Sequence, residues 1–284
     1  MNVGFIGLGV MGRPMARHLA AAGYALHVWA RRPARIGDLP ATRHATPAAL
    51  GRACTVVFTM VTSSADVEAV ALGEDGLING MAAGSVLVDC STIAPATARR
   101  LAAALRRKDI AFLDAPVSGG VQGAIAASLA IMVGGEAATL ERVRPLLEKL
   151  GRRIVHIGPN GAGQVAKACN QMVMVAAIEA VAEALHLARA AGADLARVRQ
   201  ALLGGSAASR VLDIMGQRMV ERDFTPGIEA RLHHKDFGLA LAAARQAGMP
   251  LPLTASVGQQ LNAMMAMNLG QQDTAALLRV LEAR

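Results

Sequence analysis

The sequence predicts a two-domain protein with an α/β domain over residues 1–161 and an all-α domain over residues 162–284. Up to about residue 160, short apolar runs alternate with helical stretches, which is the pattern of a doubly wound, mostly parallel sheet. A long helix is predicted over about 163–191, ended by Gly192, and the remainder shows helical periodicity without convincing strands. A chain that is 53% hydrophobic but only 2% aromatic also favours close-packed helices over an all-β sandwich.

Seven apolar runs are predicted to form the strands of the first domain. They are Val3–Ile6, Ala25–Trp29, Thr55–Met60, Ser85–Asp89, Ala111–Leu113, Ala130–Val133 and Arg153–Ile157.

The first strand leads into a glycine-rich turn. Gly7, Gly9 and Gly12 form the pattern G-x-G-x-x-G between this strand and an apolar-faced helix, and a second strand follows within about 30 residues. The first glycine permits a tight turn, the second lets a pyrophosphate approach the backbone, and the third allows close packing of helix and strand. This order predicts a Rossmann-type dinucleotide site, which also includes the intervening residues Leu8, Val10 and Met11.

The end of the second strand distinguishes the two nicotinamide cofactors. NAD enzymes usually place an acid there to bind the ribose 2′-hydroxyl, whereas this chain has Ala30, Arg31 and Arg32, and Asp38 lies too far along. Two arginines can pair with a 2′-phosphate that an acid would repel. NADP(H) is therefore the expected cofactor, with NAD(H) possible; the alternative is that the arginines are only surface charges.

Two further segments carry polar groups suited to chemistry. Ser118, Gly119 and Gly120 follow a strand and offer a hydroxyl and backbone amides to one carboxylate, although a plain turn would have the same sequence. Lys167 and Asn170 share one face of the long helix, where a partly buried lysine can exchange a proton near neutral pH. From spacing alone, a structural lysine that extends to solvent is the more frequent explanation.

Composition limits the partners that the protein can bind and the compartments in which it can be located. The net charge of +8 is dispersed and almost no aromatic residues lie between the basic groups, which argues against nucleic acid and favours an anionic substrate and cofactor. Cys54, Cys90 and Cys169 are expected to be buried thiols of a reducing compartment. Four polar residues interrupt the most apolar stretch, so neither a membrane span nor a membrane partner is expected, and a cytoplasmic location follows by elimination. The four are Lys167, Asn170, Glu179 and Glu183.

A third polar segment, His233-His234-Lys235-Asp236, is predicted to precede another apolar helix. Its adjacent histidines lack the spacing of metal ligands, so no metal site is expected. Lys235 and Asp236 are candidates either to reach the cofactor or to cap that helix.

Taken in order, five motifs resemble the β-hydroxyacid dehydrogenase family over essentially the whole chain. They are FIGLGVMGRPMARHL at 5–19, DCSTIAP at 89–95, DAPVSGG at 114–120, GAGQVAKACNQ at 161–171 and HKDFGLAL at 234–241. The resemblance implies an enzyme in which Lys167 is the catalytic proton donor and acceptor, assisted by Asn170. It also implies that residues 118–120 hold the substrate carboxylate. It places Met60, Val61, Thr92 and Lys235 beside the cofactor.

Longer stretches at 70–80, 198–219 and 222–236 are similar to the tartronate semialdehyde (2-hydroxy-3-oxopropionate) reductase branch of that family. Reduction of that aldehyde to glycerate is therefore the expected activity. The alternatives within the family are 3-hydroxyisobutyrate, 3-hydroxypropionate, L-serine and succinic semialdehyde. Lys167 argues against an imine reductase, and a non-catalytic NADP-binding module on nucleic acid is the remote alternative. Members are commonly homodimers or homotetramers, and the apolar helical half agrees with self-association.

Overall fold

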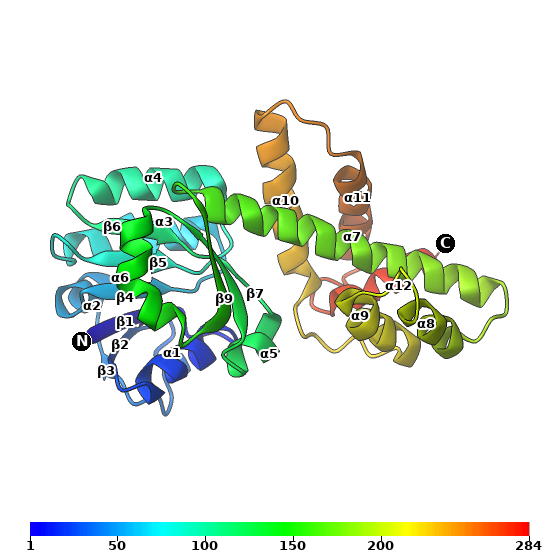
Figure 1. Ribbon diagram of the computed structural model, residues 1–284, viewed down its shortest axis with the longest axis horizontal. Coiled ribbons are helices and arrows are strands. Elements are labelled where there is room, and N and C mark those ends of the chain that lie inside the picture. The colour runs from blue at the N-terminus through cyan, green and yellow to red at the C-terminus, as the bar shows by residue number, and fades with distance from the viewer. Residues whose placement is uncertain (284) are drawn as a thin grey trace. The chain divides into compact units, whose positions relative to one another are not determined.

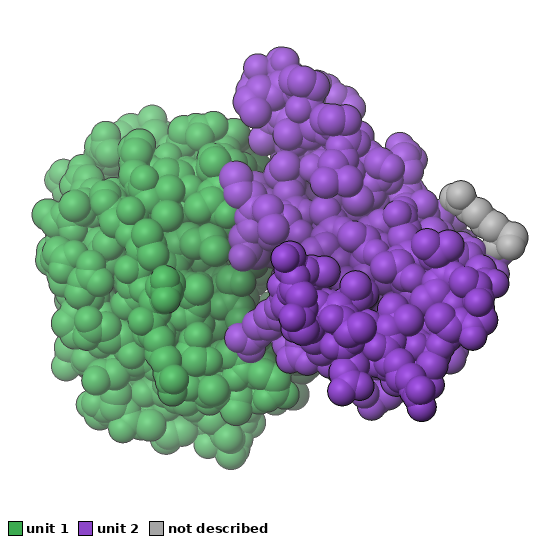
Figure 2. All heavy atoms as spheres, turned by 45° about the vertical axis from the view of Figure 1, so that its right-hand side comes forward, with its two compact units in different colours: residues 1–167 green, residues 168–284 purple. Residues whose placement is uncertain are grey.

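The chain folds into two compact units, Met1–Lys167 and Ala168–Arg284, in a computed structural model that describes residues 1–283 (Figures 1 and 2). The division falls inside helix α7 (Ala162–Ala190), later than the boundary expected at residue 161. The first turns of α7, with Lys167, therefore belong to unit 1.

Unit 1 is built on one sheet whose first six strands run parallel in the spatial order β3-β2-β1-β4-β5-β6. This is the Rossmann order, with its topological switch point beside β1. Strand β8 then pairs antiparallel with β6 and β7 and parallel with β9. The strands are β1 Asn2–Ile6, β2 Ala25–Trp29, β3 Thr42–Arg43, β4 Val56–Thr59, β5 Val86–Asp89, β6 Ala111–Asp114, β7 Val117–Ser118, β8 Leu129–Gly134 and β9 Gly151–Gly158. The predicted fold class is confirmed; β3 and β7 are too short to give a sequence pattern.

Helices cover both faces of the sheet, because successive strand residues point to opposite sides. On β4, Val56 and Phe58 join one apolar cluster while Val57 joins the other. The first cluster contains residues of α1 and α6, and the second contains residues of α2, α3 and α4 (Figure 1). The helices of unit 1 are α1 Gly12–Ala21, α2 Pro47–Ala53, α3 Ser64–Leu72, α4 Pro95–Arg106, α5 Gly120–Ile125 and α6 Ala137–Leu147, with 3-10 turns η1 Pro33–Arg35 and η2 Leu77–Asn79.

Unit 2 is helical and packs around the second part of α7. Val175, Ile178, Ala182 and Leu185 recur at helical spacing and are fully buried against α9, α10, α11 and α12. The remaining elements are α8 Leu195–Leu203, α9 Arg210–Glu221, α10 Ala230–Gln246, α11 Pro252–Ala266, η3 Thr274–Ala276 and α12 Leu277–Glu282.

Two expectations about these helices were wrong. The segment His233–Asp236 lies inside α10 and not before it. Glu229 provides no side-chain cap, so no capping pattern marks the start of this helix. Cys169 is exposed, unlike Cys54 and Cys90, because it faces away from the core on α7.

The polar residues of α7 interrupt its apolar character less than expected: within residues 1–283 this helix is long and apolar enough to cross a membrane, with a mean hydropathy of 1.4 over an 18-residue window. Such composition is weak support for a span, since a core helix has the same pattern.

Candidate active site

The predicted cofactor residues that belong to unit 1 lie at one edge of its sheet. Gly7 follows β1, Ala30 follows β2, and Met60 follows β4, and these strands are parallel, so their carboxyl ends share one edge. The backbone N–H of Met60 donates to the carbonyl of Ile6 at 2.8 Å, which holds the β1 and β4 loops together. Ligands of open α/β sheets bind outside this edge, at the switch point.

The three glycines of the turn differ in what a side chain at each position would meet. Gly7 has a φ of +98°, and a Cβ there would lie 2.1 Å from the Met60 carbonyl oxygen. A Cβ on Gly12 would lie 1.9 Å from the carbonyl oxygen of Gly7, so only glycine lets α1 start this close to the turn. A Cβ on Gly9 would meet nothing within 4 Å. The open face of Gly9 at the start of α1 fits a pyrophosphate approaching the backbone.

Arg31, the first of the two arginines after β2, lies beside an acid that the sequence did not indicate. Nη1 of Arg31 donates to Oδ1 of Asp66 at 3.0 Å, and the Ser63 hydroxyl donates to the other oxygen of Asp66 at 2.7 Å. The Ser63-x-x-Asp66 capping pattern at the start of α3 would have predicted a fixed carboxylate there, but not its partner. Asp38 is bound instead by Arg13 and Arg17. A hydrogen bond from its own backbone N–H, followed by the charges of Arg17 and Arg13, holds the pKa of Asp38 below its usual range.

A buried acid supports the loops after β4 and β5. Oδ1 of Asp89 accepts from the Thr59 hydroxyl at 2.7 Å and from the Ser91 N–H at 3.2 Å. The Ser91 hydroxyl in turn accepts from the N–H of Val61 at 2.9 Å. Asp89 is completely buried, and this burial raises its pKa to about 6, against the lowering effect of the Ser91 and Thr59 hydrogen bonds.

We expect Asp89→Asn to raise stability more at pH 7.5 than at pH 4. In the folded chain Asp89 keeps its proton up to about pH 6, whereas in the unfolded chain its carboxyl group has the ordinary aspartate pKa of 3.8. The free energy of unfolding therefore falls as pH rises through this window, by about 3 kcal/mol at most, and asparagine removes that loss. Urea unfolding of both chains at the two pH values measures this. Equal effects at both pH values would contradict it, and Asp109→Asn, at an exposed acid, is the control.

The start of α7 is fixed to the end of β6 by a second buried acid. Asp114 accepts from the N–H of Gly161 at 2.7 Å and from that of Gln164 at 3.0 Å. Burial raises the pKa of Asp114, while these backbone hydrogen bonds lower it. Lys167 follows Gln164 by nearly one turn and is only 7% exposed.

The predicted carboxylate-binding turn lies between β7 and α5. Ser118 ends β7, where it pairs with Ala130 of β8, and α5 begins at Gly120. Gly119 and Gly120 have φ values of +137° and +61°, in the region that favours glycine.

The predicted site residues Asn170 and Lys235 of unit 2 are linked through Gln171, which was assigned no role, and Asp236. Nδ2 of Asn170 donates to Oε1 of Gln171 at 2.8 Å, and Nε2 of Gln171 donates to the buried Asp236 at 2.6 Å. Nζ of Lys235 lies 3.1 Å from the other oxygen of Asp236. One hydrogen-bonded chain thus brings Asn170 and Lys235 together, because residue 171 on α7 faces α10.

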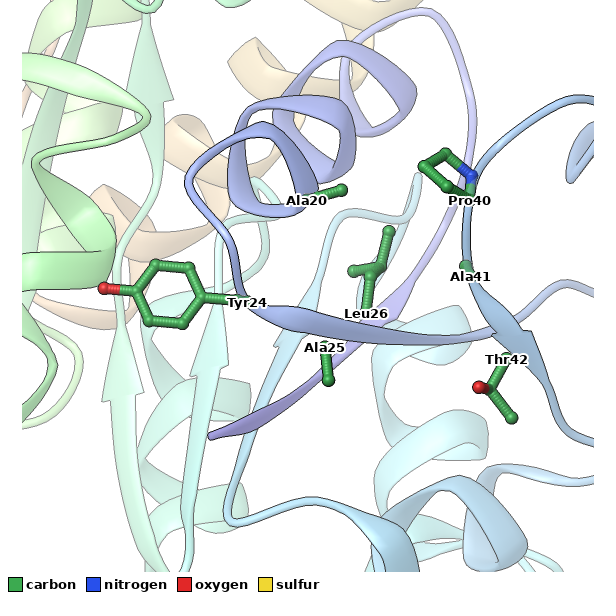
Figure 3. A pocket seen from close by; sticks show the side chains of 7 residues that line it. All are labelled: Ala20, Tyr24, Ala25, Leu26, Pro40, Ala41 and Thr42. Carbon is green, nitrogen blue, oxygen red and sulfur yellow. The ribbon is translucent and has the colours of Figure 1, made fainter.

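A solvent-open cavity of about 330 Å³ lies elsewhere in unit 1 (Figure 3). It is lined by Ala20, Tyr24, Ala25, Leu26, Pro40, Ala41 and Thr42. These residues lie at the amino end of β2, which is the opposite edge from the glycine turn, and offer neither a carboxylate nor a cation. Among residues 1–283 no group of three or more metal-ligating side chains is present either.

Comparison with known proteins follows the same division. Residues 2–158 match the NAD-binding domain of 6-phosphogluconate dehydrogenase, and residues 161–281 match the NAD-binding family of NADP-dependent 3-hydroxyisobutyrate dehydrogenase. The chain is 44% identical to 2-hydroxy-3-oxopropionate reductase of Escherichia coli, over 99% of this chain and 97% of that one. It is 42% identical to NAD-dependent L-serine dehydrogenase of Pseudomonas aeruginosa, over 89% and 88%.

A solved structure of Mycobacterium tuberculosis 3-hydroxyisobutyrate dehydrogenase with L-serine has a TM-score of 0.91 at 31% identity, covering 99% of this chain and 98% of that one. Fold, glycine turn and relatives together define an NAD(P)-dependent hydroxyacid dehydrogenase or reductase. The chain belongs to the β-hydroxyacid dehydrogenase family, which confirms the resemblance of its motifs.

Proposed function

We propose that this enzyme reduces tartronate semialdehyde to glycerate and prefers NADPH. The observation that carries the proposal is Lys167, a buried amine on the helix whose start is bound by Asp114 at the carboxyl edge of the sheet. The similarity to 2-hydroxy-3-oxopropionate reductase supports the choice of substrate.

The residues divide the work as follows. The bound cofactor supplies the hydride that the aldehyde carbon receives. Nζ of Lys167 donates a proton to the aldehyde oxygen as it becomes an alkoxide, and accepts it in the reverse direction. Ser118 and the amides of Gly119 and Gly120 hold the carboxylate, so both ends of a small substrate are fixed, which lowers the entropic part of the barrier. Asn170 orients the lysine or the substrate hydroxyl.

The cofactor-binding residues are proposed on the same basis. The glycine turn binds the pyrophosphate, Met60 and Val61 line the dinucleotide, Thr92 contacts the nicotinamide ribose, and Lys235 lies beside the cofactor. Arg31 is held by Asp66 through one nitrogen of its guanidinium, so its other N–H groups are available for a 2′-phosphate together with exposed Arg32. No acid occupies positions 30–32, where NAD enzymes usually carry one.

The proposed roles of the two parts follow from these assignments. The sheet domain, residues 1–161, binds NADP, while residues 162–284 complete the substrate site and mediate assembly into a homodimer or homotetramer. Exposed apolar side chains on α7 support self-association, with Val173 72% and Leu187 70% exposed. A small carboxylate as substrate, without nucleic acid or membrane as partner, agrees with a cytoplasmic location.

Initial rates with a panel of substrates and both cofactors test the function. We expect the kcat/KM for tartronate semialdehyde to be higher than the values for succinic semialdehyde and for the aldehydes whose reduction gives 3-hydroxyisobutyrate and 3-hydroxypropionate. It should also be higher than the kcat/KM for oxidation of L-serine. The kcat/KM for NADPH should exceed that for NADH by about tenfold or more, because a phosphate–arginine pair contributes well over 1 kcal/mol to binding. Arg32→Ala should reduce only the NADPH value, with Arg35→Ala as control. Equal kcat/KM values for NADPH and NADH would overturn the cofactor preference, and a higher kcat/KM for another substrate of the panel would overturn the choice of tartronate semialdehyde.

A further inference from the structure

Gln164 makes three hydrogen bonds although it was not among the predicted site residues. Its side chain is 1% exposed. Nε2 donates to the carbonyl oxygen of Ser91 at 2.8 Å, and Oε1 accepts from the N–H of Ile93 at 3.1 Å. Its own backbone N–H donates to Asp114 at 3.0 Å. One buried amide therefore binds the backbone on both sides of Thr92.

The loop that carries Thr92 is held from its other side as well. The N–H of Ser91 donates to Asp89, and the Ser91 hydroxyl accepts from Val61, in the loop after β4. Within unit 1, Gln164 is thus the side-chain link between this pair of loops and helix α7. Lys167 lies three residues further along the same helix, so its position relative to the loop depends on that link.

We propose that Gln164 is a positioning residue, which fixes the Thr92 loop relative to Lys167 so that hydride and proton transfer are aligned. The inference rests on the proposed function of these two residues. A carbonyl and an N–H two residues apart require an acceptor and a donor side by side, and a primary amide provides both. A carboxylate provides only acceptors, whereas a protonated carboxyl again offers one donor and one acceptor.

The test compares Gln164→Leu and Gln164→Glu with the wild-type enzyme between pH 5.5 and pH 8.5. Gln164→Leu should lower kcat by about 30-fold, because displacements of about 1 Å cost up to about 100-fold, while KM and the NADPH Kd change less than about threefold. Gln164→Glu should lose a similar factor at high pH and recover relative to wild type as pH falls, because protonation restores the donor to Ser91. Gln246→Glu, at an exposed position on α10, makes the same change without these contacts.

A loss of stability alone would give a different result. If Gln164→Leu lowered Tm but left kcat unchanged, or if the ratio of Gln164→Glu to wild type did not depend on pH, the positioning role would be overturned. Should Gln164→Leu fail to fold, Gln164→Glu at low pH still decides the matter.

Hydrogen exchange of the Ile93 amide gives a readout independent of turnover. Its protection should fall in Gln164→Leu and, at high pH only, in Gln164→Glu. An unchanged protection factor in both variants would overturn the inference even in an active enzyme. A wild-type enzyme that is inactive on every substrate of the panel, but shows the expected exchange, would instead overturn the proposed function.

Discussion

Lys167→Ala is expected to lower kcat by roughly 100-fold or more while the NADPH Kd stays nearly unchanged. Lys167 is the buried amine of unit 1, and its removal takes away the proton that the forming alkoxide needs. The cofactor is held instead by the glycine turn and the β2 arginines, which this substitution does not touch. Steady-state kinetics measure the first quantity. Quenching of Trp29, the one tryptophan, which ends β2, measures the second.

Two comparisons separate this role from a structural one. Lys149→Ala removes an exposed lysine just after α6 and should leave kcat unchanged. A small primary amine added to Lys167→Ala should restore part of the rate, because it supplies the missing proton donor. Turnover retained in Lys167→Ala, or a loss explained by a weaker NADPH Kd, would contradict the catalytic role.

The fold and the glycine turn could be predicted because their patterns are local. The turn lies within six consecutive positions from Gly7 to Gly12, and the long helix is visible as one uninterrupted apolar stretch. The spacing of Lys167 and Asn170 was equally visible, but only the family motifs favoured a catalytic reading over a structural one.

The supporting residues could not be predicted, because their partners are distant in sequence. The bond from Gln164 to Ile93 joins positions 71 residues apart, and that from Gly161 to Asp114 joins positions 47 apart. Neither residue type at its position predicts which backbone groups it will meet. Arg31 shows the same limit: its charge suggested a phosphate partner, but only the arrangement of β2 and α3 placed it beside Asp66.

Two substitutions in the glycine turn are expected to separate stability from cofactor binding: one lowers stability, and the other weakens the binding of NADPH. Gly12→Ala should lower the free energy of unfolding by about 3 kcal/mol, because its Cβ would lie 1.9 Å from the carbonyl oxygen of Gly7 and α1 would have to move.

Gly9→Ala should leave Tm unchanged, since its Cβ meets nothing within 4 Å. The same methyl group would occupy the face that the pyrophosphate approaches. Loss of one or two hydrogen bonds to a charged group should raise the NADPH Kd by about 100-fold. The control is Gly238→Ala, on an exposed face of α10 where a Cβ would have no neighbour within 4 Å. It should leave cofactor binding unchanged and raise the free energy of unfolding by no more than about 1 kcal/mol. Thermal unfolding and Trp29 quenching on the three variants measure both quantities. Normal NADPH affinity in a folded Gly9→Ala would mean that the dinucleotide does not cross this turn, and the site would then have to be sought elsewhere on the sheet edge.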